Sequence, residues 1–401
     1  MTSAKPSSYL SRLTRNTYLL ALSSLFADIS TEMLYPVLPI FLTQTLGASG
    51  SLIGLIEGVA SATQNIVQGI SGSISDKLRK RKSIALVGYV LAATGKPLMG
   101  VATIWQGVLL GRMVDRFGTG IRSAPRDALI ASSVDEADRG KAFGLESAGD
   151  NTGAFLGPLL SVFLLAVLRI NIRLIFYIAV IPGLLAFLMT ALVRESAPPT
   201  PPKTSANISP RQYPAVYWRY LGAIGIFGIG NSSNAFLIMQ IKSIGASLTT
   251  TILIYAAFNL IAALISYPAG HLADWLGRRN VLLIAFSIFF ITYLGFALTR
   301  NIVLVGLLFM GYGIYQGIFR GVGKALASSF VPDQVRASGI GWYNACVGVF
   351  TLLASLLAGW LWDKVGHAAV FAVGATSALL GSIALALLVP SDRRPRSIEA
   401  A

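Results

Sequence analysis

The chain has 401 residues, of which 54% are hydrophobic and only 12% are charged, although its formal net charge is +15. Soluble domains average about 25% charged residues, so this composition excludes an ordinary soluble protein and favours a chain embedded in a lipid bilayer. The single cysteine, Cys346, excludes a disulfide framework, and two isolated histidines exclude a His-rich metal site.

The chain begins with a polar, basic segment over 1–17 and continues with about twelve apolar stretches. Each stretch is close to the roughly 20 residues that a bilayer core requires. The predicted spans of the first half are 18–42, 51–72, 83–104, 106–128, 141–167 and 173–193. Those of the second half are 219–242, 248–269, 280–299, 302–325, 338–360 and 369–389. We therefore expect an all-α membrane protein.

A segment without apolar periodicity separates the two sets of spans and contains the run Pro198-Pro199-Thr-Pro201-Pro202. Such a composition is typical of an extended linker. The predicted domains are a cytoplasmic N-terminal segment at 1–17, a six-helix half at 18–193, a cytoplasmic linker at 194–218, a second six-helix half at 219–389, and a cytoplasmic tail at 390–401.

The basic residues gather in alternate loops. Both termini, the linker and the loops at 77–82 and 278–279 are rich in Lys and Arg, whereas the intervening loops hold few. The positive-inside rule then places both termini in the cytoplasm. We expect a multi-pass protein of the bacterial inner membrane. Because the positive charge lies in short loops between apolar spans, it argues against nucleic acid as a partner.

Two internal repeats relate the halves. The segment from Gly72 to Arg81 recurs in altered form 198 residues later, from Gly270 to Arg279. The pattern Ala128-Leu129, Arg139 and Gly144 recurs after 197 residues as Ala325-Leu326, Arg336 and Gly341. Many transporters consist of two such halves, with a substrate site between them near the middle of the membrane.

The repeated loop resembles the signature G-x-x-x-D-[RK]-x-G-R-[RK] of the major facilitator superfamily, and the resemblance covers nearly the whole chain. The first copy departs at Arg79, which replaces the second glycine, and the second departs at Trp275, which replaces the first basic residue. The resemblance implies two six-helix halves around a central cavity.

Three further patterns resemble the drug–proton antiporter branch of that superfamily. They are Pro36-Val-Leu-Pro39 in the first span, the stretch from Gly111 to Gly118 in the fourth, and Gly153-Ala-Phe-Leu-Gly157-Pro158 in the fifth. In the fourth span, Asp115 and Arg116 replace the usual Gln-Gly pair.

The two copies of the loop predict a cytoplasmic latch that stabilises one conformational state. Asp76 is expected to accept hydrogen bonds at a helix N-terminus, and the basic residues to pair with neighbouring helix ends. The alternative is a simple positive-inside anchor. The predicted latch residues are Gly72, Asp76, Lys77, Arg81, Gly270, Asp274, Arg278 and Arg279. In the fifth span, Gly153, Gly157 and Pro158 predict a bent, closely packed pivot against a helix of the other half, or else ordinary small-residue packing.

Ionisable residues inside the spans mark a pathway or a proton relay. Asp28 and Glu32 share one face of the first span, and Arg112 and Asp115 lie in the fourth. A carboxylate that gains and loses an arginine neighbour can take up and release a proton. The predicted proton-coupling residues are Asp28, Glu32 and Asp115, modulated by Arg112. The alternative is a structural ion-pair network, in which case coupling falls to Glu57, Glu146 or Asp150, or the protein is a uniporter.

The second half supplies amide and aromatic side chains with little charge, which suggests substrate recognition. The predicted cavity residues come from both halves: Tyr35, Glu57 and Arg116 from the first, and Asn231, Asn234, Tyr312, Tyr315, Gln316 and Arg320 from the second. No Walker loop, zinc motif or nucleophile elbow is present, so we expect no enzymatic activity, cofactor or bound metal.

The sequence therefore predicts a monomeric secondary active transporter, working by alternating access, that exports a small solute in exchange for protons. An alternative is a transporter of a metal ion, a metal chelate or an organic acid. An alternative of another class is a membrane receptor or scaffold that transports nothing.

Overall fold

The computed structural model describes residues 13–78, 80–135, 138–195, 213–332 and 336–391, and every regular element within these ranges is a helix. Most of the predicted N-terminal segment, linker and tail lies outside the described residues, and so do the side chains of Asp76 and Lys77.

The helices of the first half are α1 (Arg15–Glu32), α2 (Leu38–Ile40), α3 (Gly50–Leu78), α4 (Arg81–Val101), α5 (Trp105–Ser132), α6 (Arg139–Val162), α7 (Ile172–Ile178) and α8 (Val180–Ala191). Two π-helical turns, η1 (Phe41–Thr45) and η3 (Phe163–Val167), extend α2 and α6.

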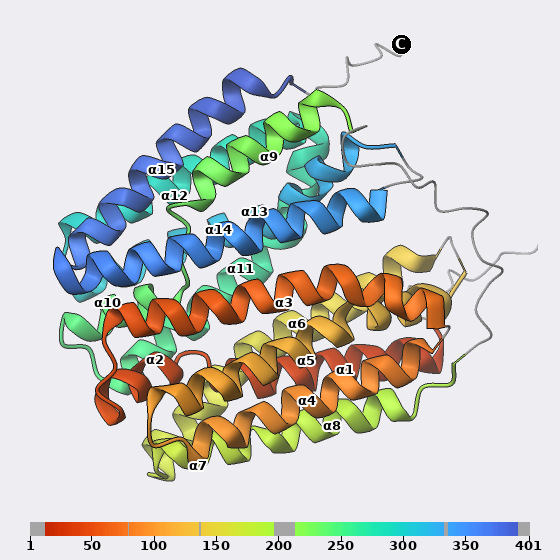
Figure 1. Ribbon diagram of the computed structural model, residues 1–401, viewed down its shortest axis with the longest axis horizontal. Helices are drawn as coiled ribbons and strands as arrows, with labels where there is room; N and C mark the ends of the chain where they lie inside the picture. Colours follow the sequence, from red (N-terminus) through yellow and green to blue (C-terminus); the bar gives the residue numbers. More distant parts are fainter. Residues whose placement is uncertain (1–12, 79, 136–137, 196–212, 333–335, 392–401) are drawn as a thin grey trace, which may run out of the picture. The chain divides into compact units, whose positions relative to one another are not determined.

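The helices of the second half are α9 (Ala215–Gly228), α10 (Ala235–Ser243), α11 (Leu248–Leu276), α12 (Arg278–Leu298), α13 (Ile302–Ser329), α14 (Arg336–Lys364) and α15 (His367–Leu388). The order of these helices in the chain can be followed by colour in Figure 1.

Three of the predicted spans are interrupted, and the sixth is divided only by a turn at Ala179 between α7 and α8. The first, expected as one helix over 18–42, ends at Glu32 and resumes at Leu38, after a turn that contains Pro36. Proline cannot donate a backbone hydrogen bond and disfavours helix in the residue before it, which accounts for the break. The seventh span, expected over 219–242, is open between Gly228 and Ala235.

Eight helical segments are long and apolar enough to cross a membrane, judged by length and composition over the described residues. They correspond to eight of the twelve predicted spans. The other four contain α1, α3, α5 and the α9–α10 pair. The breaks shorten the helices of the first and seventh predicted spans, and the charged residues of α5 lower its hydropathy.

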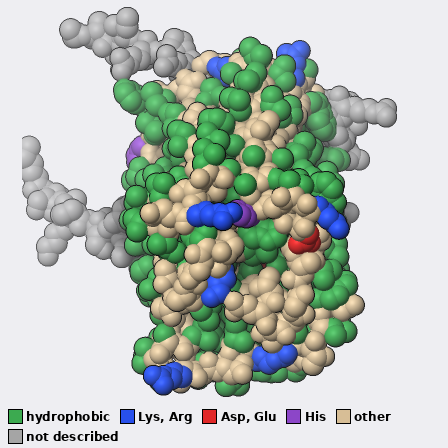
Figure 2. Space-filling view, turned by 90° about the vertical axis from the view of Figure 1, so that its left-hand side faces the viewer, with side chains coloured by type: hydrophobic (Ala, Val, Ile, Leu, Met, Phe, Trp, Pro, Cys, Tyr) green, Lys and Arg blue, Asp and Glu red, His purple; other side chains and the backbone are tan. Residues whose placement is uncertain are grey.

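The surface of the long helices is apolar. Leu298 and Leu387, for example, are 79% and 78% exposed. Exposed apolar side chains in such numbers fit contact with lipid and not with water. Figure 2 shows the end face at the left of Figure 1, where Lys and Arg form separate spots among hydrophobic side chains and acidic groups are scarce.

Internal contacts divide the chain into two compact units. Unit 1 holds residues 1–38 and 66–201, and unit 2 holds 39–65 and 202–401. The division differs from the predicted boundaries, because residues 39–65, which include the first half of α3, group with the second half of the chain. In unit 1, α1 packs against α6 and α8, and α4 packs against α5; in unit 2, α13 packs against α11 and α12, and α15 against α9 and α12.

Candidate functional site

A buried ion cluster joins α4 and α5 in unit 1. The Asp115 carboxylate lies 2.9 Å from Nζ of Lys96, 3.4 Å from Nη1 of Arg112 and 3.3 Å from Nε of Arg116. The side chains of Lys96, Arg112 and Asp115 are only 2–3% exposed. Three cations therefore surround one carboxylate inside the helix bundle, where a charged group is costly unless it has a partner of opposite charge.

Lys96 is the member of this cluster that the sequence analysis did not single out. It lies in the middle of the predicted span 83–104, directly before Pro97. A lysine at that depth was itself the available signal, because ionisable residues inside a span usually face a partner or a cavity.

The cluster also contacts the end of the first span. The guanidinium carbon of Arg112 lies 5.5 Å from the centre of the Tyr35 ring, in a cation–π arrangement. The structure thus brings together four of the predicted residues, Tyr35, Arg112, Asp115 and Arg116.

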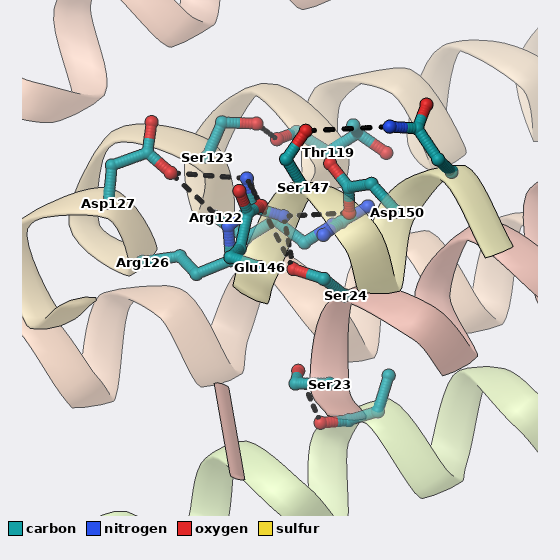
Figure 3. A network of polar contacts seen from close by, with 12 residues as sticks. Ser23, Ser24, Thr119, Arg122, Ser123, Arg126, Asp127, Glu146, Ser147 and Asp150 are labelled. Atoms are coloured by element: carbon teal, nitrogen blue, oxygen red, sulfur yellow. Dashed lines mark hydrogen bonds and ion pairs between the residues drawn. The ribbon is translucent and has the colours of Figure 1, made fainter. Parts of the chain in front are cut away.

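A second polar network, drawn in Figure 3, joins α1, α5 and α6 around Arg126. The Arg126 guanidinium lies 2.7 Å from Oε1 of Glu146, 3.1 Å from Oδ1 of Asp127 and 3.7 Å from Oδ1 of Asp150. Ser24 of α1 accepts a hydrogen bond of 2.9 Å from Arg126 and donates one of 3.1 Å to Glu146. One arginine therefore serves three carboxylates.

The glycines of α6 pack closely on α1, beside the predicted coupling residues. A Cβ atom on Gly153 would lie 2.9 Å from Cβ of Asp28, and one on Gly157 would lie 3.0 Å from Cβ of Glu32. The partner helix, α1, belongs to the same half of the chain, so the prediction of a partner from the other half was wrong. Glycine is needed here because any side chain would displace α1.

In unit 2, the break in the seventh span lies beside Glu57. Glu57 is only 3% exposed, and its Oε2 accepts a hydrogen bond of 3.4 Å from Ser233 Oγ. The backbone N–H of Ser233 donates to Ser355 Oγ at 3.2 Å. The interrupted helix thus places a hydroxyl against a buried carboxyl.

The predicted cavity residues of the second half fall into two groups. Tyr312 and Tyr315 are fully buried among aromatic rings such as Phe289, so they contribute to the core instead of facing open space in this structure. Asn231, Asn234, Gln316 and Arg320 keep partial or full exposure. The Tyr312 hydroxyl donates a hydrogen bond of 2.7 Å to Oδ1 of Asn234, which links the two groups.

The second copy of the loop motif contacts backbone carbonyls. Arg278 donates to the carbonyl oxygen of Ala325 at 3.2 Å, and Arg279 donates to those of Leu385 and Ala386, near the C-terminus of α15. A cation at that position is favourable because the helix dipole leaves the carbonyl end negative.

The other residues of the two loop copies lie in varied surroundings. Gly277 adopts φ +86°, a conformation that favours glycine and explains the second glycine of the motif. A Cβ on Gly72 would meet Ala124 of α5 at 3.3 Å, whereas Gly270 has open space around it. Asp274 is exposed and Arg81 is partly buried. The latch itself stays a prediction.

The chemistry available to these residues is hydrogen bonding, ion pairing and proton exchange. Within the described residues, no three His, Cys, Asp or Glu side chains come together as metal ligands.

A family model and a similar relative point to the same protein family. A model of the Major Facilitator Superfamily matches residues 20–311 and 220–401. An uncharacterised MFS-type transporter of Methanocaldococcus jannaschii is 34% identical over 379 residues, which cover 93% of this chain and 94% of that protein. Quinolone resistance protein NorA of Staphylococcus aureus is 27% identical over 187 residues, or 47% of each chain.

Among solved structures, a D-xylose–proton symporter aligns with a TM-score of 0.73 and 17% identity, over 94% of this chain and 98% of that one. At this identity the alignment supports the fold alone, that of twelve transmembrane helices in two halves. The match of the family model and the similarity to the archaeal relative go further, and together they show that this chain is a multi-pass membrane protein that belongs to the Major Facilitator Superfamily of transporters.

Proposed function

We propose that the protein exports a small solute from the cytoplasm of a bacterial cell in exchange for protons. The observation that carries the proposal is the concentration of carboxyl groups within the membrane-spanning part of the first half. Asp28 and Glu32 lie on α1, Asp115 on α5, and Glu146 and Asp150 on α6. Because a charge inside the bilayer is costly, such groups are usually retained for ion or proton movement.

The second half of the chain has few acidic residues. Between residues 213 and 391 the acidic residues are Asp274, Asp333 and Asp363, and the two in described helices lie within three residues of a helix end. Amide and hydroxyl groups take their place near the break between α9 and α10. This asymmetry supports a division of labour, with proton coupling in the first half and solute recognition in the second.

The direction of transport is proposed from similarity. NorA carries a name that assigns it to quinolone resistance, and the chain is similar to it over about half of each protein. The patterns at Pro36–Pro39 and Gly153–Pro158 resemble the same branch of antiporters. Export in exchange for protons entering the cell is therefore the favoured cycle, with both termini in the cytoplasm.

An anionic solute is a second candidate. Lys96, Arg112 and Arg116 all contact Asp115, so positive groups outnumber carboxylates in that cluster. A site of this kind favours an organic acid or an anionic chelate over a bare metal cation.

The test is substrate-dependent proton movement in proteoliposomes with an acidic lumen and a pH-sensitive dye. Cationic dyes, organic acids and metal chelates are supplied outside in turn. An exporter in the inverted orientation takes up its substrate while lumenal protons leave, and a protonophore abolishes the uptake. Uptake accompanied by proton entry would instead identify a symporter. If no solute of the three classes moves protons in either direction, the proposal is wrong.

A further inference from the structure

The Arg126 network has an uneven charge balance. Helix α6 packs against α1 and α5. Around Glu146 and Asp150, α5 supplies Arg126 and Asp127. From α1, Asp28 interacts electrostatically with Asp150, Glu32, Arg122 and Arg126. Arg126 is thus shared by Asp127, Glu146 and Asp150, of which Asp127 has the most exposed side chain, at 44%. An uncompensated charge of this kind is unfavourable in a low-dielectric interior, and a bound proton removes it.

Arg122 contributes little to neutralising Glu146, because it faces the other way. Its guanidinium stacks over the ring of Tyr89, with the guanidinium carbon 4.8 Å from the ring centre, and Nη1 lies 3.4 Å from the Tyr89 hydroxyl. Arg126 is therefore the cation that Glu146 and Asp150 share.

One carboxyl group of the network has unused acceptor capacity. Oδ1 of Asp150 is buried and accepts no hydrogen bond among the described residues, because its contact with Arg126 is 3.7 Å long. Asp28 of α1 interacts electrostatically with this carboxyl group. A buried carboxyl oxygen without a donor is costly, and protonation of one member supplies the missing hydrogen.

The geometry also permits Arg126 to exchange its carboxylate partners. Glu146, Asp150, Gly153 and Gly157 repeat at helical spacing, so they form one stripe of α6 that faces α1. The two glycines hold the helices together beside Asp28 and Glu32. Arg126 can then redistribute its contacts between Glu146 and Asp150 by side-chain movement, without separation of α1 from α6.

The Asp115 cluster is a poor alternative for this role. Its carboxylate already contacts three cations, and a carboxylate in such surroundings has little tendency to take up a proton. The cluster has the character of a structural lock between α4 and α5.

We propose that Glu146 and Asp150, together with Asp28, share a transported proton around Arg126. This inference rests on the proposed function, since it names the coupling site of that cycle. When the proton binds, an O–H bond forms on one carboxyl and Arg126 pairs with the other. When the proton leaves to water, Arg126 again contacts both.

The test uses infrared difference spectroscopy on the full chain in lipid, with no solute present, between about pH 5 and about pH 9. The readout is the carbonyl stretch of a protonated carboxyl that disappears as the pH rises. We expect the wild type to show this band and Glu146→Gln to lose most of it. Asp150→Asn, whose side chain is 34% exposed, serves as a second variant if Glu146→Gln does not fold. Glu195→Gln is the control, because Glu195 is exposed, accepts a hydrogen bond from the backbone N–H of Lys82 at 3.2 Å and is not part of the Arg126 network, so this variant should keep the band.

The inference is overturned if the wild type lacks the band, or if Glu146→Gln and Asp150→Asn both keep it unchanged. Failure of the proposed function has a different signature. In that case the band is present and sensitive to Glu146→Gln, but no solute moves protons across proteoliposomes.

Discussion

The carboxylate of Asp363, near the end of α14, binds the N-terminus of α3 at Gly50. Oδ1 accepts the backbone N–H of Gly50 at 2.8 Å, and Oδ2 accepts the N–H and the hydroxyl of Ser51 at 2.8 and 2.6 Å. The first N–H groups of a helix have no partner within the helix, so a carboxylate from a distant segment caps them. This contact is one of several that join residues 39–65 to the second half of the chain, with which they group.

Asp363→Ala should therefore lower the stability of the protein. Loss of a helix cap costs about 1 kcal/mol, and loss of the Ser51 contact adds to it. Thermal unfolding in detergent measures the effect. Asp363→Asn keeps an acceptor oxygen and should fall between the wild type and Asp363→Ala. Equal melting temperatures for all three proteins would contradict the role of the cap.

The cluster of Lys96 and Asp115 predicts a strong asymmetry between its members. Asp115→Asn leaves three cations around a neutral group and should cost about 3–5 kcal/mol, the usual range for breaking a buried ion pair. Lys96→Met leaves Asp115 in contact with Arg112 and Arg116 and should cost less.

The double variant Lys96→Met/Asp115→Asn should be less destabilised than the sum of the single variants, because each single change leaves a charge behind. Thermal unfolding of the four proteins gives the coupling energy. Additive effects would show that the two side chains do not stabilise each other.

Much of the fold follows from sequence patterns, and the exceptions have physical causes. Apolar length predicts the spans, since a bilayer core requires it. It does not show the breaks at Pro36 and between Gly228 and Ala235, because a broken helix keeps the apolar character of a continuous one. The polar run Asn231-Ser-Ser-Asn234 was the available signal for the second break.

The sequence predicts many of the residues that form the site, but fewer of the contacts between them. Asp115 and Arg112 lie three residues apart on one helix, so their contact follows from helical spacing. Lys96 is 19 positions away from Asp115, and Ser24 is 122 positions away from Glu146. Such contacts depend on how α1, α4, α5 and α6 pack, which one sequence does not reveal. The same holds for Tyr315, whose burial depends on its aromatic neighbours.

The glycine face of α6 gives a matched pair of substitutions. Gly153→Leu should displace α1 at Asp28, and overpacking of this kind typically costs about 1–3 kcal/mol. Gly144→Leu on the same helix enters open space and should have little effect. The yield of folded protein and the melting temperature in detergent report the difference. If both variants behave like the wild type, the close packing of α1 on α6 is not required.

Gly277 offers a test of the loop motif. At φ +86° and ψ 142°, a side chain is strained, and Gly277→Ala should cost about 1–3 kcal/mol. Gly270→Ala, seven residues earlier and inside α11, should be neutral or stabilising, because its Cβ enters open space and alanine favours a helix interior. Comparable losses in both variants would mean that the conformation of Gly277 is not the cause.

The proposed topology can be tested without knowledge of the solute. Both termini and the linker should be cytoplasmic, because the basic loops lie on that side. In a Cys346→Ser background, a cysteine at Ser205 in the linker should resist an impermeant maleimide applied to intact cells and react once the membrane is opened. Arg300→Cys is the opposite control, since Arg300 is exposed in a loop between α12 and α13 that the charge pattern places outside. It should be labelled in intact cells. The reverse labelling pattern would invert the orientation of the protein, and with it the direction assigned to export.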